Sequence, residues 1–257
     1  GNGMAWNFQI GEIARFFDVP ASTLRYWEDM GVVHPAKGAE NHYREYSIED
    51  LMTISDIVFY KNLGLRLKEI RGIKDLTPEQ HGAMFTEKLS ELERQQQMLT
   101  QRMKKLRRHI QALGILEALE REPYRETDID TECIVSFELI EQDKLRQYID
   151  NPYLYSRVQH SETLTQERRG LTVPADMAAS FPESMILWRK QSSRYIVFLM
   201  REEVTAGFPN DLRKHLEQIQ KTHRTGAVIS RFLLCAQENG RTYDFYQSFA
   251  EILPEPK

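Results

Sequence analysis

The 257-residue chain has a formal charge of -4 at neutral pH, with 41% hydrophobic and 28% charged residues. This composition predicts a soluble protein with a packed core, and the length suits two modest domains. We see no apolar run long enough to cross a membrane and no signal peptide. Residues 1–76 contain nine Lys and Arg against eleven Asp and Glu. Any affinity for DNA must therefore come from the placement of basic groups on one face.

The two cysteines, Cys133 and Cys235, lie far apart in the sequence and have no metal-ligand spacing. A disulfide framework is not expected, and a reducing cytoplasm fits this cysteine usage. An iron–sulfur centre would need a cluster of cysteines. No nucleophile–base motif or phosphate-binding loop stands out. We therefore expect no cofactor, no metal site and no catalytic residue.

Two short helices are predicted at the start of the chain. The first, within Phe8–Phe17, has apolar residues at helical spacing. Asp18-Val19-Pro20 ends it, and Pro20 suits the first turn of a second helix that runs to about Met30. Gly31 then provides a left-handed stop. Two short helices joined in this way predict a helix-turn-helix.

The stretch from Thr23 to Tyr46 carries groups suited to DNA. Arg25 offers a planar charged fork for phosphate or guanine, and Tyr26 offers a hydroxyl. Leu24 can face the core, and Trp27 is expected to pack inward. Tyr43, Arg44 and Tyr46 follow on a short extended segment, which suits a wing on the DNA backbone.

As an ordered set, these residues resemble the MerR-type transcription regulators. The shared fingerprint is Thr23-Leu24-Arg25-Tyr26, the stop at Gly31, Pro35, and the wing Tyr43-Arg44-Glu45-Tyr46. His42 stands where the family usually has a glycine. The resemblance implies a winged helix-turn-helix whose second helix enters the major groove. The residues expected to contact DNA are Arg15, Ser22, Thr23, Arg25, Tyr26, Tyr43, Arg44, Tyr46, Lys61 and Arg66.

A helix pair is expected to complete this first domain. Ser47 can cap the next helix, with Asp50 three residues later. Its buried face is predicted from the spacing of Leu51, Ile54, Val58 and Leu63. The helix should end at Asn62-Leu63-Gly64, and a shorter helix is predicted over 67–73.

From Glu79 to Arg121 the apolar positions alternate steps of four and three residues, which predicts a heptad seam. The seam consists of Phe85, Leu89, Leu92, Gln96, Leu99, Met103, Leu106, Ile110 and Leu113. A helix of this kind cannot bury its stripe alone and needs a partner. The resemblance implies an antiparallel coiled coil between the two subunits of a homodimer. The basic cluster within 102–108 is expected to be a solvated face.

The remainder of the chain predicts a different class of domain. Strands are expected at 133–137, 171–173, 185–188, 195–200, 228–236 and 242–252, with helices at 142–149 and 210–223. Asn239-Gly240 predicts the turn of the last hairpin. The order suggests a duplicated unit on one antiparallel sheet, and it resembles the GyrI-like effector domain found in several MerR-type regulators. The predicted domains are 1–77 winged helix-turn-helix, 78–122 dimerisation helix, and 123–257 α+β effector-binding domain.

The second domain is rich in aromatic residues. In a strand, Tyr243 and Phe245 point one way while Asp244 and Tyr246 point the other. An aromatic cavity with one carboxylate would suit a flat, lipophilic, often cationic organic ligand, the kind of ligand known for relatives with this domain. Glu251 is the first candidate carboxylate and Glu203 the second. The full set expected to bind the effector is Tyr148, Trp188, Glu203, Tyr243, Phe245, Phe249 and Glu251.

The resemblance implies a dimeric, DNA-binding transcription regulator. Such a dimer binds a palindromic promoter beside RNA polymerase, and an effector shifts the reading heads until the DNA is distorted. Two alternatives remain open for the C-terminal domain. It could hydrolyse small molecules, as some GyrI-like domains do with a glutamate, or it could bind a protein partner.

Overall fold

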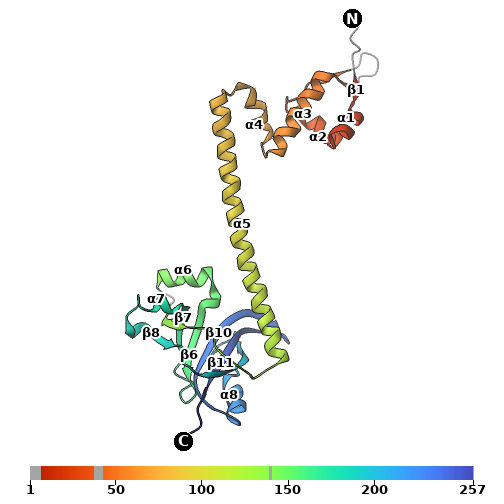
Figure 1. Ribbon diagram of the computed structural model, residues 1–257. Helices are drawn as coiled ribbons and strands as arrows, with labels where there is room; N and C mark the ends of the chain where they lie inside the picture. Colours follow the sequence, from red (N-terminus) through yellow and green to blue (C-terminus); the bar gives the residue numbers. More distant parts are fainter. Residues whose placement is uncertain (1–6, 38–42, 139–140, 257) are drawn as a thin grey trace. The chain divides into compact units, whose positions relative to one another are not determined.

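The computed structural model describes residues 7–37, 43–138 and 141–256 (Figure 1). The turn in which His42 was expected lies outside these ranges. The chain divides into two compact units, and the boundary between Gln95 and Gln96 lies within one long helix.

The first unit begins with a helix-turn-helix and a small sheet. Its elements are β1 (Phe8–Gln9), α1 (Ile10–Phe17), α2 (Ala21–Asp29), β2 (Ala36–Lys37) and β3 (Arg44–Tyr46). The strands pair antiparallel in the order β1-β3-β2. Gly31 has a φ of 74°, so the predicted left-handed stop after α2 is confirmed. Leu24 and Trp27 are buried in the core of this unit, as expected.

A helix pair follows as predicted, with one correction. The elements are α3 (Ile48–Asn62), α4 (Leu67–Gly72) and a 3-10 turn (Ile73–Asp75). Ser47 caps α3, and its hydroxyl accepts from the backbone N–H of Asp50 at 3.2 Å. Leu63 was expected on the buried face but is exposed, because it lies at the C-terminal cap, where the chain leaves the helix. Ile57, one turn after Ile54, is buried instead.

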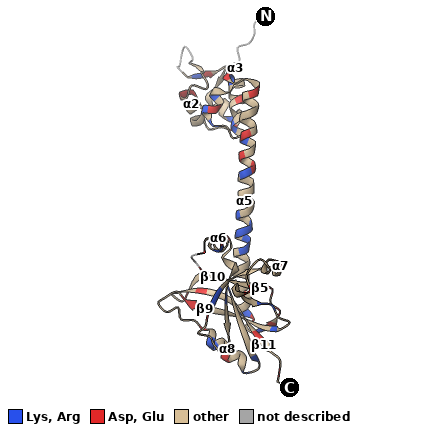
Figure 2. Ribbon diagram, turned by 90° about the vertical axis from the view of Figure 1, so that its left-hand side faces the viewer, with Lys and Arg blue, Asp and Glu red and all other residues tan. Residues whose placement is uncertain are grey.

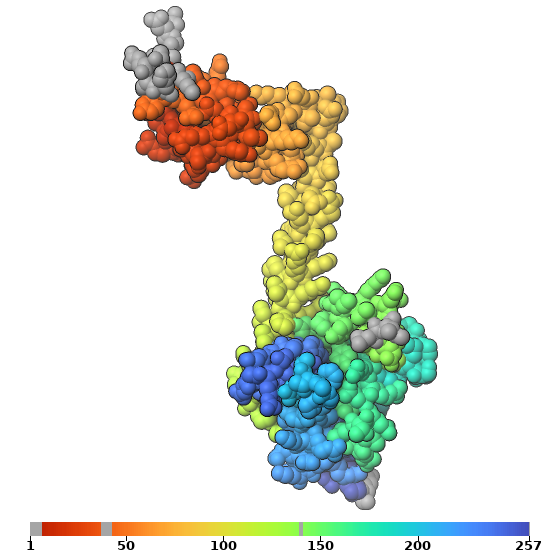
Figure 3. Space-filling model, turned by 180° about the vertical axis from the view of Figure 1, so that it is seen from behind, coloured from red at the N-terminus to blue at the C-terminus, as the bar shows by residue number. Residues whose placement is uncertain are grey.

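The long helix α5 runs from Pro78 to Arg121, 44 residues, which corresponds to roughly 66 Å of helix. Side chains from Glu91 to Arg107 are all exposed, and Figure 3 shows the yellow middle of α5 uncovered. The exposed residues include most of the heptad seam, from Leu89 to Leu113. Figure 2 shows the Lys and Arg positions within 102–108 as blue segments of the α5 ribbon. A solvated basic face was expected there, and the side chains of Arg102, Lys104 and Lys105 are exposed.

The second unit contains an eight-stranded antiparallel sheet in the order β4-β9-β11-β10-β6-β7-β5-β8. Its strands are β4 (Arg125–Thr127), β5 (Cys133–Ser136), β6 (Tyr155–His160), β7 (Arg168–Val173), β8 (Ile186–Arg189), β9 (Arg194–Glu203), β10 (Arg224–Glu238) and β11 (Arg241–Leu253). Its helices are α6 (Gln142–Asp150), α7 (Ala175–Ala178) and α8 (Leu212–Gln220), with 3-10 turns at Pro152–Leu154 (η2) and Glu183–Met185 (η3). β4 and β6 were not predicted from the sequence.

The sheet contains the duplication that the element order suggested. One half runs β5-α6-β6-β7 and the other runs β9-α8-β10-β11. In space the halves read β5-β7-β6 and β9-β11-β10, and β6 pairs with β10 between them. The two halves are therefore related by an approximate two-fold axis near the β6–β10 pair.

Each face of the sheet has its own partner. On one face, the end of α5 packs through Ala112, Ile115, Leu116 and Leu119 against Tyr195, Val197, Leu199, Phe245 and Phe249. On the other face, α8 packs through Leu212, Leu216 and Ile219 against Phe198, Met200 and Tyr246. Alternation along β11 separates these faces, because Phe245 and Tyr246 point in opposite directions. We call them the α5 face and the α8 face.

Candidate functional site

The second helix of the first unit presents polar groups on its exposed side. Leu24 and Trp27 fix α2 in the core, which leaves Ser22, Arg25 and Tyr26 in solvent. Thr23 is half-buried. The exposed face of α2 thus carries the guanidinium of Arg25 and the hydroxyls of Ser22 and Tyr26. This arrangement can bind phosphates and base edges.

The wing residues divide between surface and interior. Tyr43 is 65% exposed, whereas Tyr46 is fully buried and packs in the core of this unit. Tyr46 was expected to contact DNA, but its alternation with Glu45 on β3 turns its ring inward. Arg44 forms an ion pair with Glu28 of α2. The hydrogen bond with Glu28 raises the pKa of Arg44. In this structure Arg44 ties the wing to α2.

The other expected DNA contacts lie on the surface of the same unit. Arg15 on α1 and Lys61 near the end of α3 are both exposed. Arg66 is exposed before α4 and lies 3.4 Å from Glu69. Arg71, which the sequence did not single out, donates to the backbone carbonyl of Met30 at 2.8 Å. It therefore holds α4 against the end of α2.

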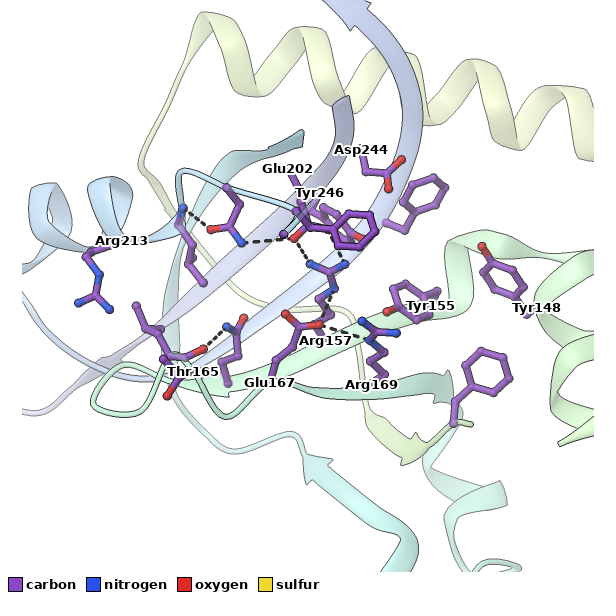
Figure 4. A pocket seen from close by; sticks show the side chains of 18 of the residues that line it. Tyr148, Tyr155, Arg157, Thr165, Glu167, Arg169, Glu202, Arg213, Asp244 and Tyr246 are labelled. Carbon is purple, nitrogen blue, oxygen red and sulfur yellow. Dashed lines mark hydrogen bonds and ion pairs between the residues drawn. The ribbon is translucent and has the colours of Figure 1, made fainter. Parts of the chain in front are cut away.

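The second unit contains a cavity of about 920 Å³ on the α8 face. Its lining comes from both halves of the duplicated sheet, including Tyr148 of α6 and Arg213 of α8 (Figure 4). Strand register builds its floor, since Glu202 lies opposite Asp244 on β11 and Asp244 lies opposite Cys235 on β10. A cavity of this size can hold a drug-sized molecule. We name it the effector pocket, after the ligand that the sequence leads us to expect.

A buried ion pair crosses the floor of the effector pocket. Arg157 of β6 is 6% exposed and Glu202 of β9 is 3% exposed. The guanidinium donates to both carboxylate oxygens of Glu202, at 2.5 and 2.8 Å, and its Nε lies 3.2 Å from Glu167. Its carbon also lies 4.5 Å from the ring centroid of Tyr246. Burial raises the pKa of the Tyr246 hydroxyl, against the opposing effect of Arg157.

Aromatic rings form one end of the effector pocket. Phe137 and Tyr148 have ring centroids 5.8 Å apart, and Tyr155 lies 5.9 Å from Tyr148. Phe232 and Tyr246 add a further edge-to-face pair at 5.7 Å. These rings can stack on a planar ligand and can contact a cation over their faces.

Asp244 lies beside this aromatic end and differs from the other carboxylates of the floor. No described lysine or arginine is within ion-pair distance of it. Burial raises the pKa of Asp244, opposed by a hydrogen bond with Cys235 and assisted by the charge of Glu202. Burial also raises the pKa of Tyr148, and the nearby Tyr155 and Asp244 add to that rise. A ligand cation could therefore gain a charge partner at Asp244.

Six of the seven residues expected to bind the effector lie outside this pocket, and only Tyr148 lines it. Tyr243, Phe245, Phe249 and Trp188 belong to the aromatic core on the α5 face. Glu203 lies across from Tyr243 and is 3.6 Å from Arg241. Glu251 accepts from the backbone N–H of Ala227 at 3.3 Å. This cavity thus lies on the α8 face, whereas most of the residues expected from the sequence to bind the effector lie on the α5 face.

The sequence contained one usable indication of the pocket. Alternation along the last strand places Asp244 and Tyr246 on the face opposite to Tyr243 and Phe245. Alternation alone gives no reason to choose between the two faces. That reason comes from Arg157 and Glu202, which are 45 residues apart in sequence and meet only through the sheet.

No group of three or more His, Cys, Asp and Glu side chains in the described part of the chain is placed to hold a metal ion. Among these residues, no helix has the length and apolar character needed to cross a membrane.

Residues 8–76 match the family described as MerR HTH family regulatory protein. The HTH-type transcriptional regulator HmrR of Rhizobium leguminosarum bv. viciae is 30% identical over 98 residues, which cover 36% of this chain and 75% of HmrR. This chain belongs to the MerR family.

Two longer relatives are similar in sequence to part of this MerR-family chain. The HTH-type transcriptional activator TipA of Streptomyces coelicolor is 29% identical over 117 residues, or 44% of this chain and 42% of TipA. The multidrug-efflux transporter 1 regulator of Bacillus subtilis is 27% identical over 157 residues, or 56% of each chain. The chain thus spans about half the length of these relatives.

Proposed function

We propose that this MerR-family protein is a cytoplasmic, homodimeric transcription regulator that binds promoter DNA and responds to a small organic effector. Residues 1–77 would form the winged helix-turn-helix, 78–122 the dimerisation helix, and 123–257 a GyrI-like effector-binding domain. The protein would act as a regulator and not as an enzyme, as its relatives are described as transcriptional regulators and activators.

The exposed side of α2 carries the DNA-binding half of this proposal. Its buried residues, Leu24 and Trp27, fix the helix, while Arg25 and Tyr26 project from the opposite side. In a helix-turn-helix, the second helix reads the major groove. We assign Arg25 and Tyr26 to that groove, and Arg15, Ser22, Tyr43, Lys61 and Arg66 to the phosphates around it.

The exposed seam of α5 supports the dimer. Leu92, Leu99, Leu106 and Ile110 are each at least half exposed in the single chain. Burying such a stripe is favourable by about 25 cal/mol for each Å² of apolar surface removed from water. A second copy of α5 supplies the matching stripe and places two reading heads on a palindromic site. Bound beside RNA polymerase, the dimer would bend and untwist the promoter.

The effector pocket supports the sensing half. Its aromatic end and the carboxylate of Asp244 suit a flat organic cation through stacking, cation–π contact and charge pairing. A regulator of a multidrug-efflux transporter is among the relatives. We assign Tyr148, Tyr155, Phe232 and Asp244 to the effector. Trp188, Glu203, Tyr243, Phe245, Phe249 and Glu251 are assigned to the fold of the domain.

One short segment connects the pocket to α5. Tyr148 of α6 lines the pocket, and two residues later Asp150 forms an ion pair with Lys105 of α5 at 2.8 Å. Tyr153 of η2 shares a hydrogen bond of 2.5 Å with Nδ1 of His109 on α5. An effector that displaces Tyr148 would shift these two contacts and so bias α5.

The DNA-binding half can be tested on a site selected from random double-stranded DNA. We expect Arg25→Ala to weaken binding by tenfold or more, and Arg102→Ala on the exposed middle of α5 to leave binding unchanged. Titrations at several salt concentrations measure both. Equal curves for Arg25→Ala and the parent would contradict the assignment of α2.

The sensing half can be tested by thermal shift of the full chain with planar cationic dyes. Ligand binding raises the melting temperature by mass action. We expect a saturable shift that Asp244→Asn reduces and that Glu251→Gln and Glu203→Gln leave intact. No shift with any dye, or turnover of a bound compound, would count against an effector sensor and would favour the partner-binding or hydrolase alternative.

A further inference from the structure

The charges of the effector pocket are not evenly compensated. Arg157 pairs with Glu202 and Glu167, and Arg169 lies 3.4 Å from Glu167. These four groups form one neutral network across the middle of the pocket. Asn210 adds a hydrogen bond to Glu202 at 3.3 Å. The charged groups of this floor are therefore paired with one another and need no ligand charge to balance them.

Outside the network, the charged side chains that line the pocket are Asp244 and Glu138, which are acidic, and Arg213, which is basic. Asp244 lies beside the aromatic end, and no described lysine or arginine pairs with it. Arg213, in the first turn of α8, lines the other end, and among the described residues it has no hydrogen-bond or ion-pair partner. Figure 4 shows Asp244 and Arg213 on opposite sides of the Arg157–Glu202 pair.

The surroundings make the two ends chemically different. The Asp244 end has the rings of Phe137, Tyr148 and Tyr155, and the exposed Glu138 lies at its rim. The Arg213 end has Thr165 and Asn210, both of which can hydrogen-bond to an anion. A cation with an aromatic group fits the first end, and a carboxylate or phosphate fits the second.

We propose that the effector is a zwitterion. Its ammonium group, which carries an aromatic substituent, lies at the Asp244 end, and its acidic group lies at the Arg213 end. This inference rests on the proposed sensing function and names the class of ligand within it. A purely cationic ligand would leave Arg213 without a partner. A purely anionic ligand would lie against Asp244 and Glu138. A molecule that carries both charges satisfies the two ends and adds no net charge to the pocket.

The test uses the full-length chain and three matched series of compounds. N-benzyl-ω-aminoalkanoic acids carry both charges, N-benzylalkylamines carry the cation only, and N-benzoyl-ω-aminoalkanoates carry the anion only. Each series is titrated calorimetrically over a range of spacer lengths. At one spacer length we expect the zwitterion to bind about tenfold more tightly than either analogue, which corresponds to about 1.4 kcal/mol.

Variants at the two ends identify which charge acts where. Arg213→Gln is expected to remove the advantage of the zwitterion over the amine, while the neighbouring Lys214→Gln, which does not line the pocket, should preserve it. Asp244→Asn is expected to weaken the amine and the zwitterion and to spare the anion. Arg213 is exposed, and Asn has nearly the shape of Asp, so both variants should fold.

The outcomes separate this inference from the proposed function. Amines that bind as tightly as the zwitterions, or a zwitterion advantage that survives Arg213→Gln, would overturn the inference and leave a sensor of cations. Anions that bind best would overturn it in favour of an acidic effector. If none of the three series binds a chain shown to be folded, both the zwitterion and the aromatic effector are refuted.

Discussion

The two faces of the sheet in the second unit are formed by the same strands but bury different kinds of side chain. The α5 face holds Phe245, Phe249 and Tyr195 in a core that α5 covers. The α8 face holds Arg157 and Glu202, which are nearly as buried but charged. Aromatic side chains release free energy when they leave water, whereas buried charges cost free energy unless they are paired. The first face is therefore built for stability, and the second maintains polar groups at the bottom of a cavity.

The difference between the faces also explains why aromatic residues alone do not locate the ligand-binding site. Three aromatic residues of β11, Tyr243, Phe245 and Phe249, were candidates for ligand binding, yet on the α5 face they pack within the core. A binding face needs rings that are left partly uncovered beside groups that give orientation. Tyr148 and Asp244 meet that requirement, and Phe249 does not.

The largest effect is expected on the α5 face. Phe249→Ala should lower the free energy of unfolding by about 4 kcal/mol, because it removes a buried ring and leaves a cavity. Affinity for a pocket ligand should stay unchanged at temperatures where the variant is folded. Urea unfolding and calorimetric titration measure the two properties. A large loss of affinity in the folded variant would mean that the faces are not independent.

On the α8 face, Arg157→Met should cost about 3 kcal/mol, because it leaves the buried carboxylate of Glu202 without its cation. The double variant Arg157→Met/Glu202→Leu should recover most of that loss, since two apolar side chains can replace a buried ion pair. Urea unfolding of the parent and of the three variants, including Glu202→Leu alone, completes the thermodynamic cycle. A double variant that is no more stable than Arg157→Met would show that the pair is not the source of the effect.

A smaller effect, with a defined pH dependence, is expected for Asp244. Burial raises its pKa in the folded chain above the unfolded value of about 3.9. The folded state therefore holds this proton more tightly, so the contribution to stability is present below the unfolded pKa and is lost as pH rises through the folded pKa. Asp244→Asn should melt higher than the parent at pH 7, and the difference should shrink toward pH 4. A difference in melting temperature that is independent of pH would contradict this reading.

The smallest effect is expected where α5 meets α6. Lys105 and Asp150 are both more than half exposed, and such pairs contribute little to stability. The hydrogen bond with Lys105 lowers the pKa of Asp150, so Lys105→Gln should return that pKa toward its usual range without a measurable change in melting temperature. An NMR pH titration of the carboxylate follows the pKa. If the pKa does not move, the ion pair is absent in solution.

The first unit and the helix α5 could be predicted closely from the sequence because their determinants are local. Gly31 ends α2, Ser47 caps α3, and the heptad spacing defines α5 over nearly its full length. Tyr46 and Leu63 were exceptions. The burial of Tyr46 depends on which side of β3 meets the core, and the exposure of Leu63 depends on where α3 stops.

The pocket could not be predicted in the same way because its determinants are distant in sequence. Strand β6 was missed, since Arg157 and Gln159 interrupt the apolar alternation that marks a half-buried strand. Those two residues interrupt the pattern because they line the pocket. Alternation in β11 predicts that Asp244 and Tyr246 share one face, but which face holds the pocket depends on the contact between Arg157 and Glu202.

The approximate two-fold axis between β6 and β10 has an evolutionary consequence. The effector pocket lies where the two halves of the sheet meet, with Tyr148 from one half and Arg213 from the other. A half-length chain with a single strand–helix–strand–strand unit would reach the same architecture by pairing with a second copy, but both of its walls would then be identical. Fusion into one chain allows each wall to diverge. The acidic aromatic end and the basic polar end of this pocket are a difference that a symmetric dimer could not possess.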